Sequence, residues 1–230
     1  MGAAEEVLHD WGRAAISYSQ ARAFAEIVPT TQADRELVAR TLADFPMECQ
    51  CRGMFFDGLV GAIESTRGAA ARQRVVELAA VPRSLVPFAL RPHRDFYKLF
   101  FLGAATLHPR MPLDRAMQMV AETFYPVFQR SMVGRTMSVF MGDEPSRMIG
   151  RLAEAYRLSV TWNEHSVKTL GPKAAEWTAK VEPCPFYPSV FSGIVLGTMR
   201  THGVDEPKIE TLSREREGAA MRFVFRIGWS

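Results

Sequence analysis

The sequence has only three cysteines in 230 residues, and no apolar run comes near the length of a membrane span. A transmembrane helix needs about 20 consecutive apolar residues, whereas the longest candidate, 96–107, is short and contains a lysine. The N-terminus lacks a basic start followed by an apolar block, so we expect no secretory signal. The cysteines Cys49, Cys51 and Cys184 are therefore expected to be reduced thiols in a cytoplasmic protein.

The chain also lacks a strong charge of either sign. Lysine and arginine number 28 and the acidic residues 25, which gives a net charge of +3. Nucleic-acid binding usually needs a basic stripe rather than a slight surplus, so we do not expect a nucleic-acid partner. With 47% hydrophobic and 23% charged residues, the composition is that of an ordinary globular protein.

Recognisable catalytic motifs are missing as well. The five histidines are scattered without a zinc-binding pair, and Cys49 and Cys51 are separated by one residue, closer than in a C-x-x-C ligand pair. No phosphate loop, dinucleotide-binding glycine motif or nucleophile elbow is present. We therefore predict a non-enzymatic protein with no catalytic residues, no metal ligands and no cofactor.

Apolar residues recur at helical spacing through most of the first 156 residues. Thr31, with Asp34 three residues later, is typical of a helix N-cap, and Pro126 is expected to kink or end a helix near Tyr125. An irregular connection is expected over Val81–Pro92 because it contains three prolines. The predicted helices are 3–28, 31–45, 53–65, 70–80, 96–107, 113–128 and 144–156.

After Tyr156 the apolar period changes from 3.6 to 2, which is typical of strands that bury one face. A helix interrupts these strands and ends before Gly203, and its Gly193 and Gly197 are expected to let it lie close on a sheet. The pattern predicts an α/β (α+β) fold, in which an N-terminal helical layer precedes a four-stranded antiparallel sheet with one inserted helix. The predicted elements are strand 158–162, strand 175–181, helix 188–202, strand 208–215 and strand 221–229.

Aromatic side chains are plentiful in the helices that precede the sheet. Such rings could line an apolar pocket for a small ligand, or they could simply fill the core. The candidates for a ligand pocket are Tyr97, Phe100, Phe101, Phe124 and Phe128.

Four short segments carry motifs that recur together in one family. Cys51–Gly58 is similar to R-G-x-F-F-(N)-G, and Ser131–Thr136 is similar to S-x-x-G-[RK]-T. Ala155–Arg157 matches A-Y-R, and Phe225–Trp229 is similar to a closing y-x-x-S-W, with Gly228 where serine is usual. Together they resemble a large myxobacterial paralogous family whose function is unknown.

A more distant likeness lies in the order of the elements. Met54–Ile63 stands where a ligand-sensing domain begins, Phe96–Leu99 is similar to an early x-Y-K-L helix, and the chain closes with helix, strand, strand and a tryptophan. This layout resembles the heme-based nitric oxide and oxygen sensing domain (H-NOX), the vinyl-reductase-type domains and the TRAPP-type trafficking subunits. The resemblance implies an extension over 1–30 and an H-NOX-like domain over 31–230.

The H-NOX resemblance also implies where a heme would be held. In that family a proximal histidine ends the helix before the sheet, and a Y-x-S-x-R motif holds the propionates. By position, Tyr156 stands in place of the histidine, and Trp177–Val181 reads Trp-Thr-Ala-Lys-Val at the propionate site. Tyrosine can ligate ferric heme, so Tyr156 is our candidate cofactor-binding residue, although without the propionate clamp we expect no heme.

Three functions remain open at this point. The first is a sensor or adaptor domain that binds a small apolar ligand or a protein partner without heme. The second is a structural interaction module that self-associates, as the TRAPP-type resemblance implies, and the third is a heme or tetrapyrrole sensor that uses Tyr156.

Overall fold

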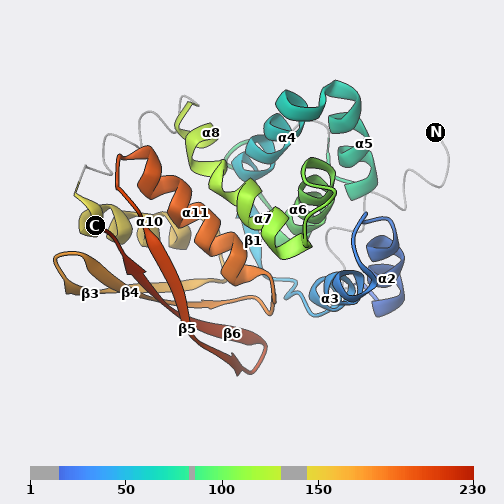
Figure 1. Cartoon of the computed structure of the whole chain (residues 1–230). Helices are drawn as coiled ribbons and strands as arrows, with labels where there is room; N and C mark the ends of the chain where they lie inside the picture. The colour runs from blue at the N-terminus through green and yellow to red at the C-terminus, as the bar shows by residue number, and fades with distance from the viewer. Residues whose placement is uncertain (1–15, 83–85, 131–143) are drawn as a thin grey trace. The chain divides into compact units, whose positions relative to one another are not determined.

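A computed structural model describes residues 16–82, 86–130 and 144–230 (Figure 1). The chain divides into two compact units, Met1–Ala116 and Met117–Ser230, and the boundary falls within helix α7 (Leu113–Glu122). The helix predicted over 3–28 lies outside the described residues as far as residue 15. The boundary predicted at residue 30 stays a prediction.

The N-terminal unit begins with two helices that pack on each other, α2 (Tyr18–Glu26) and α3 (Gln32–Ala43). The hydroxyl of Thr31 accepts a hydrogen bond from the Asp34 backbone N–H at 3.1 Å, which confirms the predicted N-cap.

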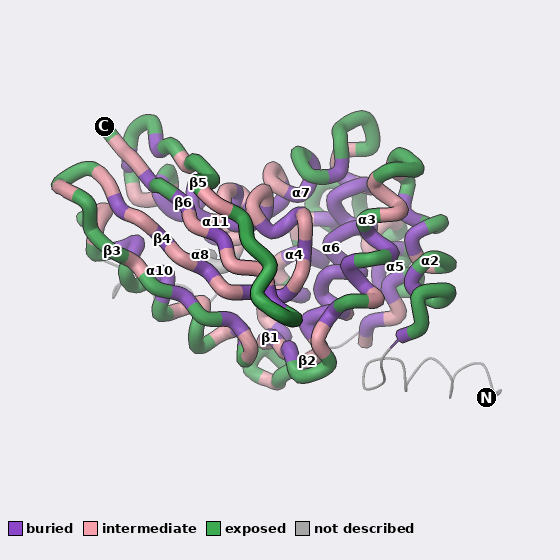
Figure 2. The backbone as a smooth tube through the Cα atoms, turned by 90° about the horizontal axis from the view of Figure 1, so that it is seen from below, coloured by how far each residue is buried: buried purple, intermediate pink, exposed green. Residues whose placement is uncertain are grey.

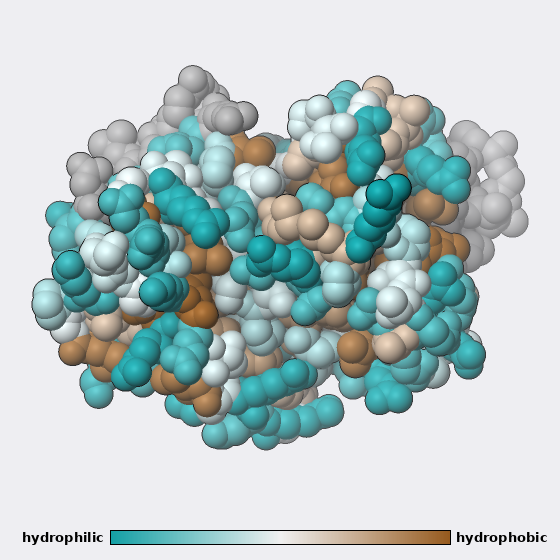
Figure 3. Space-filling view, viewed as in Figure 1, coloured by the Kyte–Doolittle hydropathy of each residue, from teal (hydrophilic) through white to brown (hydrophobic). Residues whose placement is uncertain are grey.

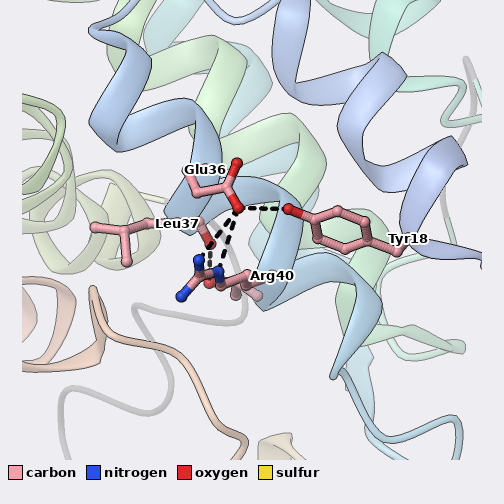
Figure 4. Close-up of polar contacts among 5 residues, drawn as sticks. Tyr18, Glu36, Leu37 and Arg40 are labelled. Carbon is pink, nitrogen blue, oxygen red and sulfur yellow. Dashed lines mark hydrogen bonds and ion pairs between the residues drawn. The ribbon is translucent and has the colours of Figure 1, made fainter.

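A surface network joins the two helices (Figure 4). The Tyr18 hydroxyl on α2 donates to Glu36 Oε1 on α3 at 2.5 Å, and Arg40 forms an ion pair with the same carboxylate at 3.2 Å. Because the network crosses from one helix to the other, it adds to the packing of the pair.

The remaining helices of this unit are α4 (Met54–Arg67), α5 (Ala69–Ala79) and α6 (His93–Leu107). Helix α6 begins three residues before the predicted start, is buried along nearly its whole length and packs against α3, α4 and α5. Two short strands, β1 (Gln50–Arg52) and β2 (Leu90–Pro92), pair in antiparallel fashion. Strand β1 leads into α4, and β2 leads into α6. The prediction of an irregular connection through Pro92 was wrong at its end, because the last three residues form β2.

The C-terminal unit contains helices packed on one face of an antiparallel sheet, with strands in the order β3-β4-β6-β5. Helices α10 and α11 both contact Trp177 on β4, so they cover the same face. Figure 2 shows the alternation of buried and less buried residues along β4. The elements after α7 are α8 (Phe124–Arg130), α10 (Pro145–Ser159), β3 (Glu164–Gly171), β4 (Ala174–Val181), α11 (Tyr187–Thr201), β5 (Lys208–Glu217) and β6 (Ala220–Gly228).

Two predicted boundaries differ from the structure. The strand expected over 158–162 is wrong, because α10 continues to Ser159 and the Val160 N–H still bonds to the Tyr156 carbonyl at 3.1 Å. The first strand begins instead at Glu164. The helix predicted over 113–128 breaks at Thr123, two residues before the kink expected near Tyr125, since Pro126 has no N–H to donate to the carbonyl four residues earlier.

The described helices include none with the length and apolar character that a membrane crossing requires. On the face shown in Figure 3, hydrophilic side chains are spread widely and hydrophobic ones surface in small groups.

Gly193 and Gly197 lie against helix α7 and not against the sheet, contrary to the sequence-based expectation. A Cβ on Gly193 would lie 2.3 Å from the Gln118 carbonyl oxygen, and one on Gly197 would lie 2.2 Å from the Glu122 carbonyl oxygen. The two glycines therefore allow α11 to approach the backbone of α7 more closely than any other residue would. The opposite side of α11 faces the sheet, where the Phe191 ring stacks on Phe225 at 4.1 Å.

We predict that Gly193→Ala destabilises the protein by about 2–3 kcal/mol, because the added methyl group must push α11 away from α7. Gly150→Ala is the matched control, since Gly150 also lies within a helix and its Cβ would meet no atom within 4 Å. The control should be stabilised by about 0.5–1 kcal/mol through helix propensity alone. Urea denaturation measures both, and equal stabilities would contradict the close contact.

Candidate functional site

The aromatic residues proposed for a ligand pocket lie in both units. Tyr97, Phe100 and Phe101 are buried on α6, where the Tyr97 ring lies 5.8 Å from that of Phe101. Phe124 is half-buried on α8, and the side chain of Phe128 lies outside those described. The structure thus brings the three α6 rings together in the core of the N-terminal unit, and their role in a pocket stays a prediction.

Tyr156 lies near the end of α10, next to two side chains of the sheet. Its ring centroid is 4.8 Å from that of His165 on β3 and 5.8 Å from that of Trp177 on β4, with an edge-on geometry to the indole. The residue as a whole is half-buried, but its hydroxyl oxygen is buried and has no hydrogen-bond partner among the described residues. Burial, together with the nearby Glu182 carboxylate, raises the pKa of Tyr156 far above its ordinary value.

His165 is held by a buried hydrogen bond from the sheet. The Trp177 indole N–H donates to His165 Nδ1 at 3.1 Å. Burial lowers the pKa of His165 to about 3, with a smaller contribution from Arg157, so the imidazole is neutral at neutral pH. Since the indole can only donate, Nδ1 must accept, and the imidazole proton is therefore on Nε2. That nitrogen is also buried and lacks a partner within the described part of the chain.

Tyr187 completes the group from the first turn of α11. Its hydroxyl is likewise buried without a hydrogen-bond partner among the residues the structure describes. Burial is the main cause of the strongly raised pKa of Tyr187, and the charges of Tyr156, Glu182 and Cys184 add to it. Both phenols therefore stay neutral, close to each other and to the fully buried Glu182. We call Tyr156, His165, Trp177, Glu182 and Tyr187 the Tyr156 cluster.

The sheet and α11 support the Tyr156 cluster with stacked rings. Trp177 is paired across the ladder with Phe225 on β6, and both side chains are fully buried. Phe191 on α11 packs against both, with its ring centroid 4.9 Å from that of Trp177 and 4.1 Å from that of Phe225. Tyr187 in turn stacks on Phe223 at 5.2 Å. The polar atoms of the Tyr156 cluster thus lie next to a closely packed layer of apolar rings.

Sequence reasoning found Tyr156 but missed His165 and Tyr187. His165 was counted among the scattered histidines, and the strand in which it lies was predicted too early in the chain. The signal that could have found it is the burial pattern of β3, in which His165 is the only buried residue. A histidine at the buried position of a strand is a polar group that needs a hydrogen-bond partner in the protein interior.

The N-terminal unit contains a second buried polar contact. Cys49 Sγ lies 3.4 Å from His93 Nδ1, and both residues are buried. The pair supplies two of the four ligands that a structural zinc site takes. The His93 ring stacks on Phe96 at 5.8 Å, so the contact also belongs to the aromatic core of this unit.

The Arg52-Gly53 pair of the first sequence motif anchors the connection before α6. Arg52 Nη1 donates to the Phe88 carbonyl at 2.9 Å, and the Gly53 N–H donates to the Ala89 carbonyl at 3.0 Å. A Cβ on Gly53 would lie 2.4 Å from the Val86 carbonyl oxygen, so this close approach requires glycine. The pair therefore has a clear role in the fold.

The other motifs divide between the cluster and the undescribed segment. The A-Y-R motif supplies Tyr156 to the cluster, and the closing motif supplies Phe225, which lies beneath Phe191. The segment Ser131–Thr136 lies outside the described residues.

Comparison with known proteins gives one family and one fold. Residues 47–230 match the sequence profile of a family described as "Protein of unknown function (DUF2378)". No curated protein sequence matches the chain.

Solved H-NOX domains match the structure. An oxygen-binding H-NOX domain related to soluble guanylate cyclases, in its oxygen complex, is 14% identical with a TM-score of 0.62, over 78% of this chain and 95% of that chain. A mutant H-NOX domain of T. tengcongensis is 14% identical with a TM-score of 0.61, over 78% of this chain and 97% of that chain. An H-NOX structure from a study of heme distortion gives a TM-score of 0.61 at 14% identity, over 78% and 95%. At this identity the likeness shows the fold alone, and it confirms the predicted H-NOX-like architecture.

We predict that acid destabilises the protein through His165. Because its pKa falls from 6.5 to about 3 on folding, the unfolded chain binds a proton between these pH values that the folded chain does not. The stability that depends on neutral His165 is therefore complete above pH 6.5 and is lost as the pH falls, by about 2 kcal/mol at pH 5.

Urea denaturation at pH 7 and pH 5 checks this expectation. His165→Gln, whose amide oxygen can still accept from Trp177, should lose less stability between the two pH values than the parent. The pKa of His108 is also lowered by burial and by Arg67, and this contribution is the same in parent and variant. Equal losses would show that His165 does not carry the effect.

Proposed function

Because this chain belongs to the DUF2378 family of proteins of unknown function and has an H-NOX-like fold, we propose that it is a non-enzymatic sensor or adaptor domain. In this proposal it binds a small molecule or a protein partner without heme. The observation that carries the proposal is the Tyr156 cluster, in which buried polar atoms without protein partners among the described residues gather around Tyr156. Tyr156 is the residue that the sequence resemblance puts in place of the heme histidine.

The residues at the heme-ligand position do not fit a heme. Tyrosine ligates ferric heme as a phenolate, and the pKa of Tyr156 is raised by burial and by the Glu182 carboxylate. Forming a phenolate there would place a second negative charge near a buried carboxylate, which is unfavourable.

The propionate position does not fit either. Trp177, Ala179 and Val181 are the buried residues of β4, and Thr178 and Lys180 alternate with them. The strand therefore presents an indole and small apolar side chains to the covered face, where the resemblance expects a Y-x-S-x-R clamp. Its single polar atom on that face, the indole nitrogen, already donates to His165.

We expect no stoichiometric heme binding when the purified chain is incubated with hemin, or with reduced heme and carbon monoxide. Absorption spectroscopy should show no Soret band that scales with the protein concentration. The same preparation, examined by native mass spectrometry and again after denaturation, should release a small molecule if the small-ligand form of the proposal holds. A stoichiometric Soret band that Tyr156→Phe abolishes would contradict the proposal.

A second candidate function is a self-associating interaction module. The segment before α6 exposes three large apolar side chains at every second position, with Val86, Phe88 and Leu90 exposed by 62%, 55% and 45%. Backbone hydrogen bonds from Gly53 and Met54 hold this segment in place. Exposed apolar side chains grouped on a fixed segment are typical of protein-binding surfaces.

If self-association uses this segment, Phe88→Asp should shift the chain toward the monomer, because a charge in an apolar contact is costly to bury. Light scattering coupled to size-exclusion chromatography measures the mass of each species. Leu158→Asp is the matched control, since Leu158 is 65% exposed on α10 in the C-terminal unit. A parent chain that is monomeric at all concentrations would contradict this second function.

A further inference from the structure

We propose that the Tyr156 cluster is a binding site for a small neutral molecule that carries a hydrogen-bond acceptor such as a carbonyl group. This inference rests on the proposed sensor function and names the chemical class of its ligand. The ligand would accept hydrogen bonds from Tyr156, His165 and Tyr187, which lie on three different elements of the C-terminal unit.

The first step is the direction of the hydrogen bond at His165. Its Nδ1 accepts from the Trp177 indole, so its Nε2 carries the proton and can only donate. The buried Nε2–H lacks a protein acceptor among the described residues, and a buried donor without a partner is costly. A ligand that satisfies it must therefore offer an acceptor.

The second step concerns the two phenols. The hydroxyls of Tyr156 and Tyr187 are buried, unpartnered within the described residues, and close enough for the charge of one to raise the pKa of the other. A carbonyl oxygen has two lone pairs, so it can accept from two of the three donors at once. Tyr156, His165 and Tyr187 bring buried donors from three elements to one neighbourhood of the C-terminal unit.

The third step is the charge of the ligand. Glu182 is fully buried, and its carboxylate raises the pKa of both Tyr156 and Tyr187. An anionic ligand would meet this negative charge in a medium of low polarity, where repulsion is strong. A neutral acceptor avoids the repulsion and still satisfies the donors.

The fourth step is access and shape. Tyr156 and Trp177 supply aromatic surfaces beside the polar atoms, and Tyr156 is only half-buried as a residue near the end of α10. A ligand with a flat apolar body and one polar group matches this combination, since small-molecule sites are mostly apolar with a few placed polar groups.

Acetophenone, a neutral aromatic ketone, is the probe for this site in the full chain. Titration should shift the Trp177 indole N–H resonance, assigned with Trp177→Phe, with a dissociation constant of about 0.1–10 mM for a ligand of this size. Ethylbenzene, which keeps the apolar body of acetophenone but lacks the carbonyl oxygen, should bind at least about tenfold more weakly. Benzoate, which is charged, should also bind more weakly than acetophenone.

Tyr187→Phe removes one donor and keeps the ring, so it should weaken acetophenone binding about tenfold. The loss of an unpartnered buried hydroxyl should leave the ligand-free variant at least as stable as the parent, which thermal unfolding verifies. Tyr125→Phe is the matched control, because the Tyr125 hydroxyl bonds to His202 Nε2 at 2.7 Å in the same unit but outside the cluster. It should leave acetophenone affinity unchanged.

Equal binding of acetophenone and ethylbenzene, or equal affinity in the parent and Tyr187→Phe, would overturn the assignment of the site. Tighter binding of benzoate would overturn the neutral ligand class. The proposed function fails on a different result, the stoichiometric Soret band that depends on Tyr156, so the two failures are distinguishable. A released small molecule that binds the parent and Tyr187→Phe equally would retain the sensor function and place its ligand elsewhere.

Discussion

The hydrogen bond from the Trp177 indole to His165 is the constraint on which the rest of the Tyr156 cluster depends. It joins neighbouring strands on the covered face of the sheet and fixes which imidazole nitrogen carries the proton. Burial keeps that imidazole neutral, so the bond gives the cluster a donor of fixed direction. Because the Nε2 of this imidazole can only donate, any group that hydrogen-bonds to it must be an acceptor.

The cluster has a cost that the fold offsets elsewhere. Buried hydroxyl and imidazole N–H groups without partners are unfavourable in a protein interior. Around them, Phe191, Phe223 and Phe225 form a stacked aromatic layer that buries a large apolar area. The proposed binding role would account for the retention of these polar atoms in an otherwise apolar layer at the expense of stability.

Local signals predicted much of this fold. The cap at Thr31, the buried helix α6 and the alternating strands β4 and β6 follow from spacing within a few residues. The pair β1 and β2 could not be found in this way, because each strand has three residues and forms only through pairing between distant segments.

The candidate site also depends on contacts between distant segments, which local sequence patterns do not predict. Tyr156 was found through a motif, whereas His165 and Tyr187 are brought to it by strand register and by the position of α11. Alternation at Leu158 and Val160 suggested a strand, but the helical hydrogen bond to the Tyr156 carbonyl extends α10 through this stretch. A two-residue period over a few positions does not distinguish the end of a helix from the start of a strand.

The glycine contact between α11 and α7 has a mechanical consequence. Tyr187 lies in the first turn of α11, and Gly193 and Gly197 hold the following turns against the carbonyls of α7 with no side chain between. Close-packed contacts of this kind have low compressibility. A movement of α11 toward α7 would therefore press directly on the α7 backbone.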